Sequence, residues 1–258
     1  MMKPIVIKIG GSTIEQLPDT FYQEIGVLMQ SRPVVIVHGG GPAINKRLKQ
    51  LDIEPDFHQG LRITTPEIME VVEQVLAGSI NKKLVRQFIV NHVAAAGISG
   101  QDCGLLIAEK MDQLIGLVGD IKSVQPTILN TLLDQGIVPV VSPIGLSPEG
   151  EPLNINADHA AVHIAKALNA TMLFATDVPG VMENGAVLHQ LSHVDVNRLK
   201  EEGTIYGGMI PKVDSALFAI DAGVDEAVIF NGFQANVIAN YFNGKSVGTT
   251  FKKKVAQA

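Results

Sequence analysis

The chain contains no tryptophan, one cysteine and few aromatic residues, and it carries no excess of positive charge. Because Cys103 is the only cysteine, no intrachain disulfide can form; this is typical of proteins of a reducing compartment, so we expect a cytoplasmic protein. The net charge of -6 and the 5% of aromatic residues give neither the basic surface nor the stacking platform of a nucleic-acid-binding protein. We interpret the one lysine cluster, residues 252–254, as a solvated tail.

Long apolar runs are also missing from the 258 residues. No run approaches the roughly 18 apolar residues of a membrane-spanning helix. The first apolar stretch is too short, and too soon interrupted by glycine, for a signal peptide. We therefore expect no membrane association. Because 46% of the residues are hydrophobic, the chain can bury a large core as one large domain or as two lobes.

What is present is an alternation of short β-branched runs and longer amphipathic stretches. Strands are predicted within residues 5–9, 33–41, 171–182 and 226–232, and helices over 19–30, 42–51, 64–78, 81–97, 158–170, 211–224 and 236–244. Segments 104–111, 114–121 and 137–150 predict short strands, added locally in antiparallel order. The alternation predicts an α/β fold, a three-layer sandwich around a mainly parallel sheet, with any division into lobes near Ala170.

Lys8 lies within the first strand pattern, in the run IVIKIGGS. Such a run of β-branched residues is typical of a strand buried on both faces, where an unpaired ammonium group is costly. From this run alone two interpretations stay open. Either Lys8 reaches solvent at the carboxyl end of the strand, or an anion meets it there.

Five segments place glycine or polar residues where predicted strands lead into helices. They are Lys8–Gly11, His38–Pro42, Asn154–His159, Thr176–Val181 and Gly207–Lys212. In a parallel sheet, ligands bind at such strand ends, and glycine loops with helix N-termini favour anions. The chain has neither a Walker-type phosphate loop nor a dinucleotide fingerprint. His159 and His163 have the spacing of a zinc protease, but Ala160 replaces the required glutamate, so we interpret both as exposed or helix-packing residues.

Six motifs resemble, in order and spacing, those of the amino-acid kinase family over nearly the whole chain. They are IVIKIGGS, VIVHGGGPAIN, GLRITT, LNINADHAA, ATDVPGV and GGMIPKV. HGGGP followed by GLR, and NINAD, are similar to the branch that acts on N-acetyl-L-glutamate. The resemblance implies an amino-acid kinase fold and ATP-dependent phosphorylation of the γ-carboxylate, a step of arginine biosynthesis, with ATP and Mg²⁺. It also implies one domain over 1–258, in which lobe 1–170 binds the amino acid and lobe 171–258 binds ATP.

The resemblance also implies roles for individual residues. Lys8 and Lys212 match two lysines that contact the transferring phosphoryl group, and Asp158 matches the carboxylate that holds both lysines. Matches to the substrate site are Gly40 and Gly41 beside the reacting carboxylate, and Arg62 and Asn154 on the rest of the molecule. Matches to the nucleotide site are Gly10, Gly11, Asp177, Val178, Pro179, Gly180, Val181, Tyr206 and Met209. No metal-ligating residue is expected.

The chemistry of the implied reaction agrees with these roles. A carboxylate nucleophile is already ionised at pH 7, so the reaction requires no general base. It does require positive charge around the phosphoryl group, which two lysines supply. A kinase of another acidic derivative, such as a carrier-bound aminoadipate, and a catalytically silent nucleotide-binding relative remain as alternatives.

Two further expectations concern assembly and regulation. The family implies a homodimer, and segment 64–78 is expected to supply interface surface because its apolar positions exceed one narrow stripe. A capping-box pattern, Thr64 with Glu67, opens this segment. Arginine-inhibited members of the family carry an additional N-terminal helix. The seven residues before Lys8 are too few for such a helix, so we expect no inhibition by arginine.

Overall fold

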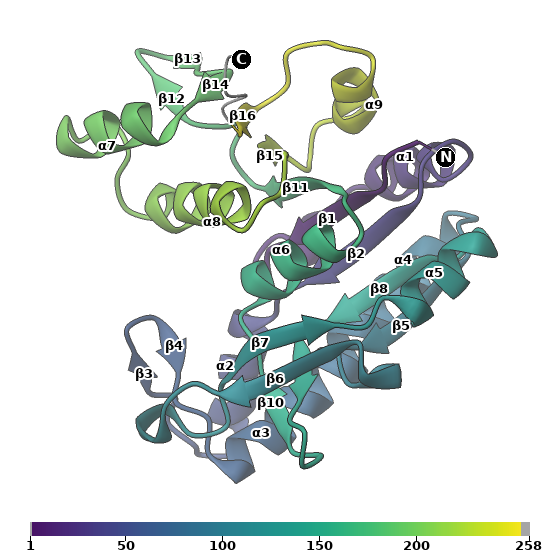
Figure 1. The fold of residues 1–258 in the computed structure, drawn as a ribbon, viewed down its shortest axis with the longest axis vertical. Coiled ribbons are helices and arrows are strands. Elements are labelled where there is room, and N and C mark those ends of the chain that lie inside the picture. The colour runs from purple at the N-terminus through teal and green to yellow at the C-terminus, as the bar shows by residue number, and fades with distance from the viewer. Residues whose placement is uncertain (1, 254–258) are drawn as a thin grey trace.

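The computed structural model describes residues 2–253, so Lys254 of the lysine cluster lies outside the described residues. Within that range, eight strands form one central sheet (Figure 1). In spatial order they are β14 (Gln190–Leu191), β16 (Thr249–Lys252), β15 (Glu226–Asn231), β11 (Thr171–Thr176), β1 (Ile5–Ile9), β2 (Val34–His38), β8 (Val138–Ser142) and β5 (Ala95–Ser99). Neighbouring strands are parallel except β15 and β16, which confirms the predicted α/β fold.

Strand β1 lies in the middle of this sheet, and its residues point alternately to the two faces of the sheet. Ile5, Ile7 and Ile9 belong to one core cluster, whereas Val6 belongs to the other. Because side chains alternate along a strand, Lys8 lies on the same face as Val6. The first cluster packs with α1 (Asp19–Leu28), α2 (Gly41–Gln50), α3 (Pro66–Glu73), α4 (Asn81–Val90) and α9 (Val237–Phe242). The second packs with α6 (Ala157–Ala167), α7 (His193–Glu201) and α8 (Met209–Asp221).

A smaller sheet covers part of the same face as α6. Its order is β10 (Pro152–Asn154), β9 (Ile144–Leu146), β6 (Leu106–Lys110) and β7 (Gly119–Val124). Its pairs are antiparallel except β6 with β9, which agrees with the predicted local addition, although β8 joins the main sheet. Two hairpins complete the strands: β3 (Phe57–His58) with β4 (Leu61–Arg62), and β12 (Met182–Glu183) with β13 (Ala186–Val187).

The predicted helix over 81–97 is wrong in its second half. Helix α4 ends at Val90, His92 has a left-handed φ of 61°, and the chain then forms the edge strand β5. Alanines favour a helix locally, but pairing with β8 overrides that preference. The strand predicted over 114–121 is wrong in its first half, since Gln113–Ile115 is a 3₁₀ turn and β7 begins only at Gly119. Elements that were not predicted are α5 (Thr127–Asp134), α7, the hairpins β3–β4 and β12–β13, the strands β10, β14 and β16, and the 3₁₀ turns Ile14–Gln16 and Asp102–Gly104.

Segment 64–78 differs from its prediction in two respects. The helix cap is Thr65, whose hydroxyl oxygen accepts the Ile68 N–H, while Thr64 is buried; the helix then continues as a π-helix over Gln74–Ile80. Its large apolar residues are buried within the chain itself: Ile68, Met69, Val71, Val72, Val75 and Leu76. These residues therefore leave no apolar surplus on this segment, which was the reason for expecting interface surface here, and its place in a dimer interface stays a prediction. Within residues 2–253, no helix has the length and apolarity to cross a membrane.

Candidate active site

Lys8 and Asp158 form an ion pair at the carboxyl end of β1. The Lys8 Nζ lies 2.9 Å from Oδ1 and 3.0 Å from Oδ2 of Asp158, and both side chains are largely shielded from solvent. Asp158 lies in the first turn of α6, where the side chain of Asn156 caps the helix by accepting the Asp158 N–H at 2.8 Å. Asn156 therefore caps the helix, and the carboxylate of Asp158 faces Lys8.

Two cavities meet at this ion pair. One, of about 270 Å³, is lined by Gly11, Gly40, Gly41, Arg62 and Asn154 among others, and the second, of about 300 Å³, by Gly10, Ser12, Thr176, Asp177 and Lys212 among others. Lys8 and Asp158 line both cavities. Parallel strands bring these groups together, because β1, β2 and β11 end at the same edge of the sheet.

The glycines after β1 and β2 allow two backbone segments to approach closely. A β-carbon on Gly11 would lie 2.9 Å from the Cα of Gly40, and one on Gly40 would lie 2.4 Å from Cδ2 of Leu76. Helix α2 begins at Gly41, so its first N–H groups and its positive dipole end lie beside Lys8. This part of the smaller cavity is suited to an anion.

Arg62 adds an unpartnered buried donor to the smaller cavity. Its side chain is 7% exposed, its Nη1 has no hydrogen-bond partner, and its Nη2 donates to Oδ1 of Asn45. The guanidinium lies over the ring of Phe57, 4.8 Å from its centroid, and burial lowers the pKa of Arg62. Within residues 2–253 no carboxylate lies within 4.0 Å of it. A buried guanidinium with a free donor is suited to a carboxylate ligand.

Asn154 extends this polar wall. Its Nδ2 donates to the hydroxyl of Thr64 at 3.1 Å, and that hydroxyl donates to the backbone oxygen of Arg62 at 2.8 Å. Asn154 is thereby tied to the strand that carries Arg62. The structure brings together all four residues predicted for the amino-acid substrate.

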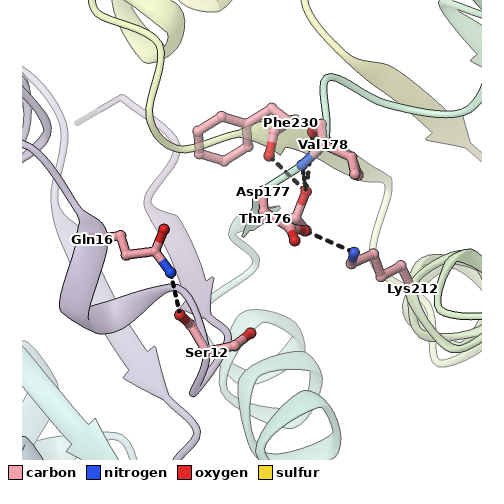
Figure 2. Close-up of polar contacts among 7 residues, drawn as sticks. All are labelled: Ser12, Gln16, Thr176, Asp177, Val178, Lys212 and Phe230. Atoms are coloured by element: carbon pink, nitrogen blue, oxygen red, sulfur yellow. Dashed lines mark hydrogen bonds and ion pairs between the residues drawn. The ribbon is translucent and has the colours of Figure 1, made fainter.

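Lys212 stands on the other side of the larger cavity, in the first turn of α8. Its Nζ lies 2.9 Å from Oδ1 of Asp177, the first residue after β11, and Figure 2 shows this pair. The lysine hydrogen bond lowers the pKa of Asp177. The buried hydroxyl of Thr176 shapes the loop after β11 through the backbone of Val178 and Phe230. The expectation that Asp158 holds both lysines is therefore not met here, since Lys212 pairs with Asp177.

The residues matched to the nucleotide site are only partly gathered. Gly10 and Asp177 line the larger cavity, whereas Gly11 lines the smaller one. Val181 is in the core, and its N–H donates to Thr249; Gly180 is also buried. Val178, Pro179, Tyr206 and Met209 do not line the larger cavity, and Tyr206 is 74% exposed. The lining residues Ser12, Thr176 and Gly208 were missed, although each lies within or beside a quoted motif.

The two histidines of α6 have a packing role. His159 stacks on Phe218 of α8 at 4.5 Å between ring centroids, and His163 lies 6.2 Å from the same ring. Burial lowers the pKa of both histidines. Within residues 2–253, no three His, Cys, Asp or Glu side chains are grouped as a metal site.

Comparison with known proteins decides the family. The model of the amino acid kinase family matches residues 3–231. The chain belongs to the amino-acid kinase family. Among relatives in this family, it is 44% identical to the acetylglutamate kinase of Geobacillus kaustophilus over 99% of this chain and 98% of that protein. It is 45% identical to the acetylglutamate kinase of Brevibacillus brevis, over 98% of each.

Solved structures show the same fold. The protein smu.665 of Streptococcus mutans has a TM-score of 0.83 and 32% identity to this amino-acid kinase family member, covering 98% of this chain and 99% of that one. Carbamate kinase of Giardia lamblia, bound to AMP-PNP, has a TM-score of 0.66 with 18% identity, covering 98% and 99%. At that identity the likeness shows the shared fold alone.

Proposed function

We propose that this member of the amino-acid kinase family transfers the γ-phosphoryl group of ATP to the γ-carboxylate of N-acetyl-L-glutamate, a step of arginine biosynthesis. The observation that carries the proposal is the Lys8–Asp158 pair at the common wall of two cavities. A phosphoryl transfer needs its acceptor and its donor held in line, with positive charge beside the group that is transferred. The names of the curated relatives agree with this acceptor.

In the proposed reaction, lobe 1–170 binds the acetylated amino acid and lobe 171–258 binds ATP. A γ-carboxylate oxygen forms a bond to the γ-phosphorus as the bond from that phosphorus to the β,γ-bridging oxygen breaks, and the electron pair leaves with ADP. Lys8 and Lys212 stabilise the charge on the phosphoryl oxygens, while Asp158 orients Lys8. No side chain takes a proton, because the nucleophile is already ionised.

Substrate recognition is assigned to the smaller cavity. The free Nη1 of Arg62 binds the carboxylate that does not react, and Asn154 contacts the same molecule. The N–H groups of Gly40 and Gly41 face the reacting carboxylate. Mg²⁺ is carried by ATP oxygens and water, as is common for this ion, and adds positive charge at the phosphates. We propose a homodimer as the assembly.

An assay that traps acyl phosphate with hydroxylamine tests the proposal. N-acetyl-L-glutamate should give ATP-dependent hydroxamate, and glutamate should give far less, since it lacks the acetamido group and its ammonium would meet Asp158 only where that carboxylate already pairs with Lys8. Product with another acidic derivative alone would assign the chain to a different branch, and no product with any acid would favour a silent relative. Arg62→Ala should raise the KM for acetylglutamate at least tenfold and leave the KM for ATP nearly unchanged. The exposed Arg47→Ala, on α2, is the matched control.

A further inference from the structure

His38 is a buried histidine that the proposed reaction does not use. It is the last residue of β2, immediately before the glycines of the HGGG sequence, and it is 0% exposed. Burial lowers its pKa to about 4, so the ring is neutral at pH 7. Its Nδ1 lies 3.0 Å from the backbone oxygen of Gly39, and its Nε2 lies 3.3 Å from Nδ2 of Asn81.

These two contacts determine which ring nitrogen carries the proton. A carbonyl oxygen can only accept, so Nδ1 donates to the oxygen of Gly39. Nε2 faces an amide NH₂ group, which can only donate, so Nε2 presents its lone pair. In a protonated ring Nε2 would also carry a hydrogen, and this N–H donor would face the amide N–H donor of Asn81. The neutral Nδ1–H tautomer is therefore the form that fits this site.

Asn81 anchors the histidine to the sheet. Its Nδ2 also lies 2.8 Å from the oxygen of Val140 on β8 and 3.2 Å from that of Ile98 on β5. Its Oδ1 accepts from the ammonium of Lys82 at 3.2 Å. A β-carbon on Gly97 would lie 1.8 Å from Oδ1 of Asn81, so that glycine leaves the space that the amide fills. Asn81 has little freedom to turn.

The anchored carbonyl of Gly39 has a consequence for the next residue. A trans peptide unit is planar, with its C=O and N–H pointing in opposite directions. Because His38 holds the oxygen of Gly39 on its own side, the N–H of Gly40 points away from His38. Within residues 2–253 that N–H has no protein acceptor, and Gly40 lines the smaller cavity.

We infer that His38 and Asn81 are positioning residues that aim the Gly40 N–H at the reacting carboxylate. Leu76 and Ile80 hold the same glycine from the π-helix, with side-chain atoms 2.4 and 2.5 Å from where its β-carbon would stand. The inference rests on the proposed function, because the N–H acts only if the smaller cavity binds the acceptor carboxylate. Loss of this positioning should lower kcat rather than raise KM, because a donor matched to the transition state stabilises mainly the transition state.

Two isosteric variants test the inference. His38→Asn keeps an amide donor near the position of Nδ1, whereas His38→Gln places its amide near Nε2 and leaves the oxygen of Gly39 without a donor. We expect His38→Gln to lower kcat about 10- to 100-fold, with both KM values within about threefold of wild type. We expect His38→Asn to keep kcat within about threefold. Thermal melting should show both variants folded and of similar stability, because both remove the ring.

A second measurement separates this inference from the proposed reaction. Hydrogen exchange of the Gly39–Gly41 amides should be faster in His38→Gln than in His38→Asn, whatever the substrate. If the wild-type protein has no kinase activity, the proposed function is refuted. The difference in hydrogen exchange between the two variants then still tests whether His38 positions the glycine loop. Wild-type kcat in His38→Gln, an equal loss in His38→Asn, or equal exchange in the two variants would overturn the positioning role.

Discussion

Replacing Gly40 by alanine should damage catalysis through close contacts with two side chains, Leu76 and Ile80. The φ of Gly40 is -179°, outside the left-handed region that favours glycine, so the effect of alanine is predicted from space. The obstacle is space, because the new methyl group would stand 2.4 Å from Cδ2 of Leu76 and 2.5 Å from Cδ1 of Ile80. Carbon atoms pack at about 3.5–4.0 Å, so something must move by roughly 1 Å.

The magnitude follows from that displacement. Overpacking of this kind costs about 1–3 kcal/mol of stability, which a chain of this size tolerates. A shift of about 1 Å in a catalytic donor costs on the order of 100-fold in rate. We therefore expect Gly40→Ala to lower kcat by about two orders of magnitude, with a native circular dichroism spectrum and a Tm lowered by only a few degrees.

Two comparisons make the result specific. Gly78→Ala adds the same methyl group within the π-helix, where no atom lies within 4 Å, and it should behave as wild type. Leu76→Val with Ile80→Val removes the opposing δ-carbons, and in the Gly40→Ala background this pair should restore part of kcat. Wild-type kcat in Gly40→Ala, measured by hydroxamate formation, would refute the reasoning from close approach. A full loss that the valine pair does not relieve would refute the named contacts.

Three further predictions concern charge, pH and assembly. Lys8→Ala and Lys212→Ala should each lower kcat about 100-fold or more, with exposed Lys49→Ala unchanged; wild-type kcat in either would remove that lysine from the mechanism. The pKa of His38 is about 6.5 in the unfolded chain and about 4 in the folded protein, so the unfolded chain binds the proton first as the pH falls. The free energy of unfolding should therefore fall by about 2 kcal/mol more between pH 7 and pH 5 in the wild type than in His38→Asn. Urea titrations with parallel pH curves for the two proteins would contradict this. Light scattering should show a homodimer whose size does not change with millimolar arginine, and the activity assay should show no inhibition by arginine. A hexamer that arginine inhibits would contradict both expectations.

The sequence predicts β1 correctly because the signal there is local. Four β-branched positions around Lys8, followed by two glycines, describe a buried strand end without reference to the rest of the chain. The same holds for α6, where Asn156 and Asp158 begin a helix with alanines on its buried face. The candidate substrate residues follow such local motifs, and the fold brings them to one cavity.

The failures have a different physical origin. The two alanines of strand β5 favour a helix locally, and its pairing with β8 and the space that Gly97 leaves for Asn81 decide its form as a strand. The partner of Lys212 depends on the placement of the loop after β11, 35 residues earlier in the chain. Val181 was matched within a motif, yet its side chain turns into the core. Contacts of this range leave no periodic signal in the sequence.

The three cations of the two cavities differ in a way that orients the proposed substrate. Lys8 and Lys212 each have a carboxylate partner, Asp158 and Asp177, whereas Arg62 has none within residues 2–253. N-acetyl-L-glutamate carries two carboxylates of equal charge, so charge alone does not select which one reacts. A carboxylate gains more binding free energy at Arg62, because this buried guanidinium has lost hydrogen bonds to water and a ligand carboxylate replaces them. The other carboxylate is then left beside the glycine loops and Lys8, where the phosphoryl group arrives, and the acetamido group distinguishes the substrate from free glutamate.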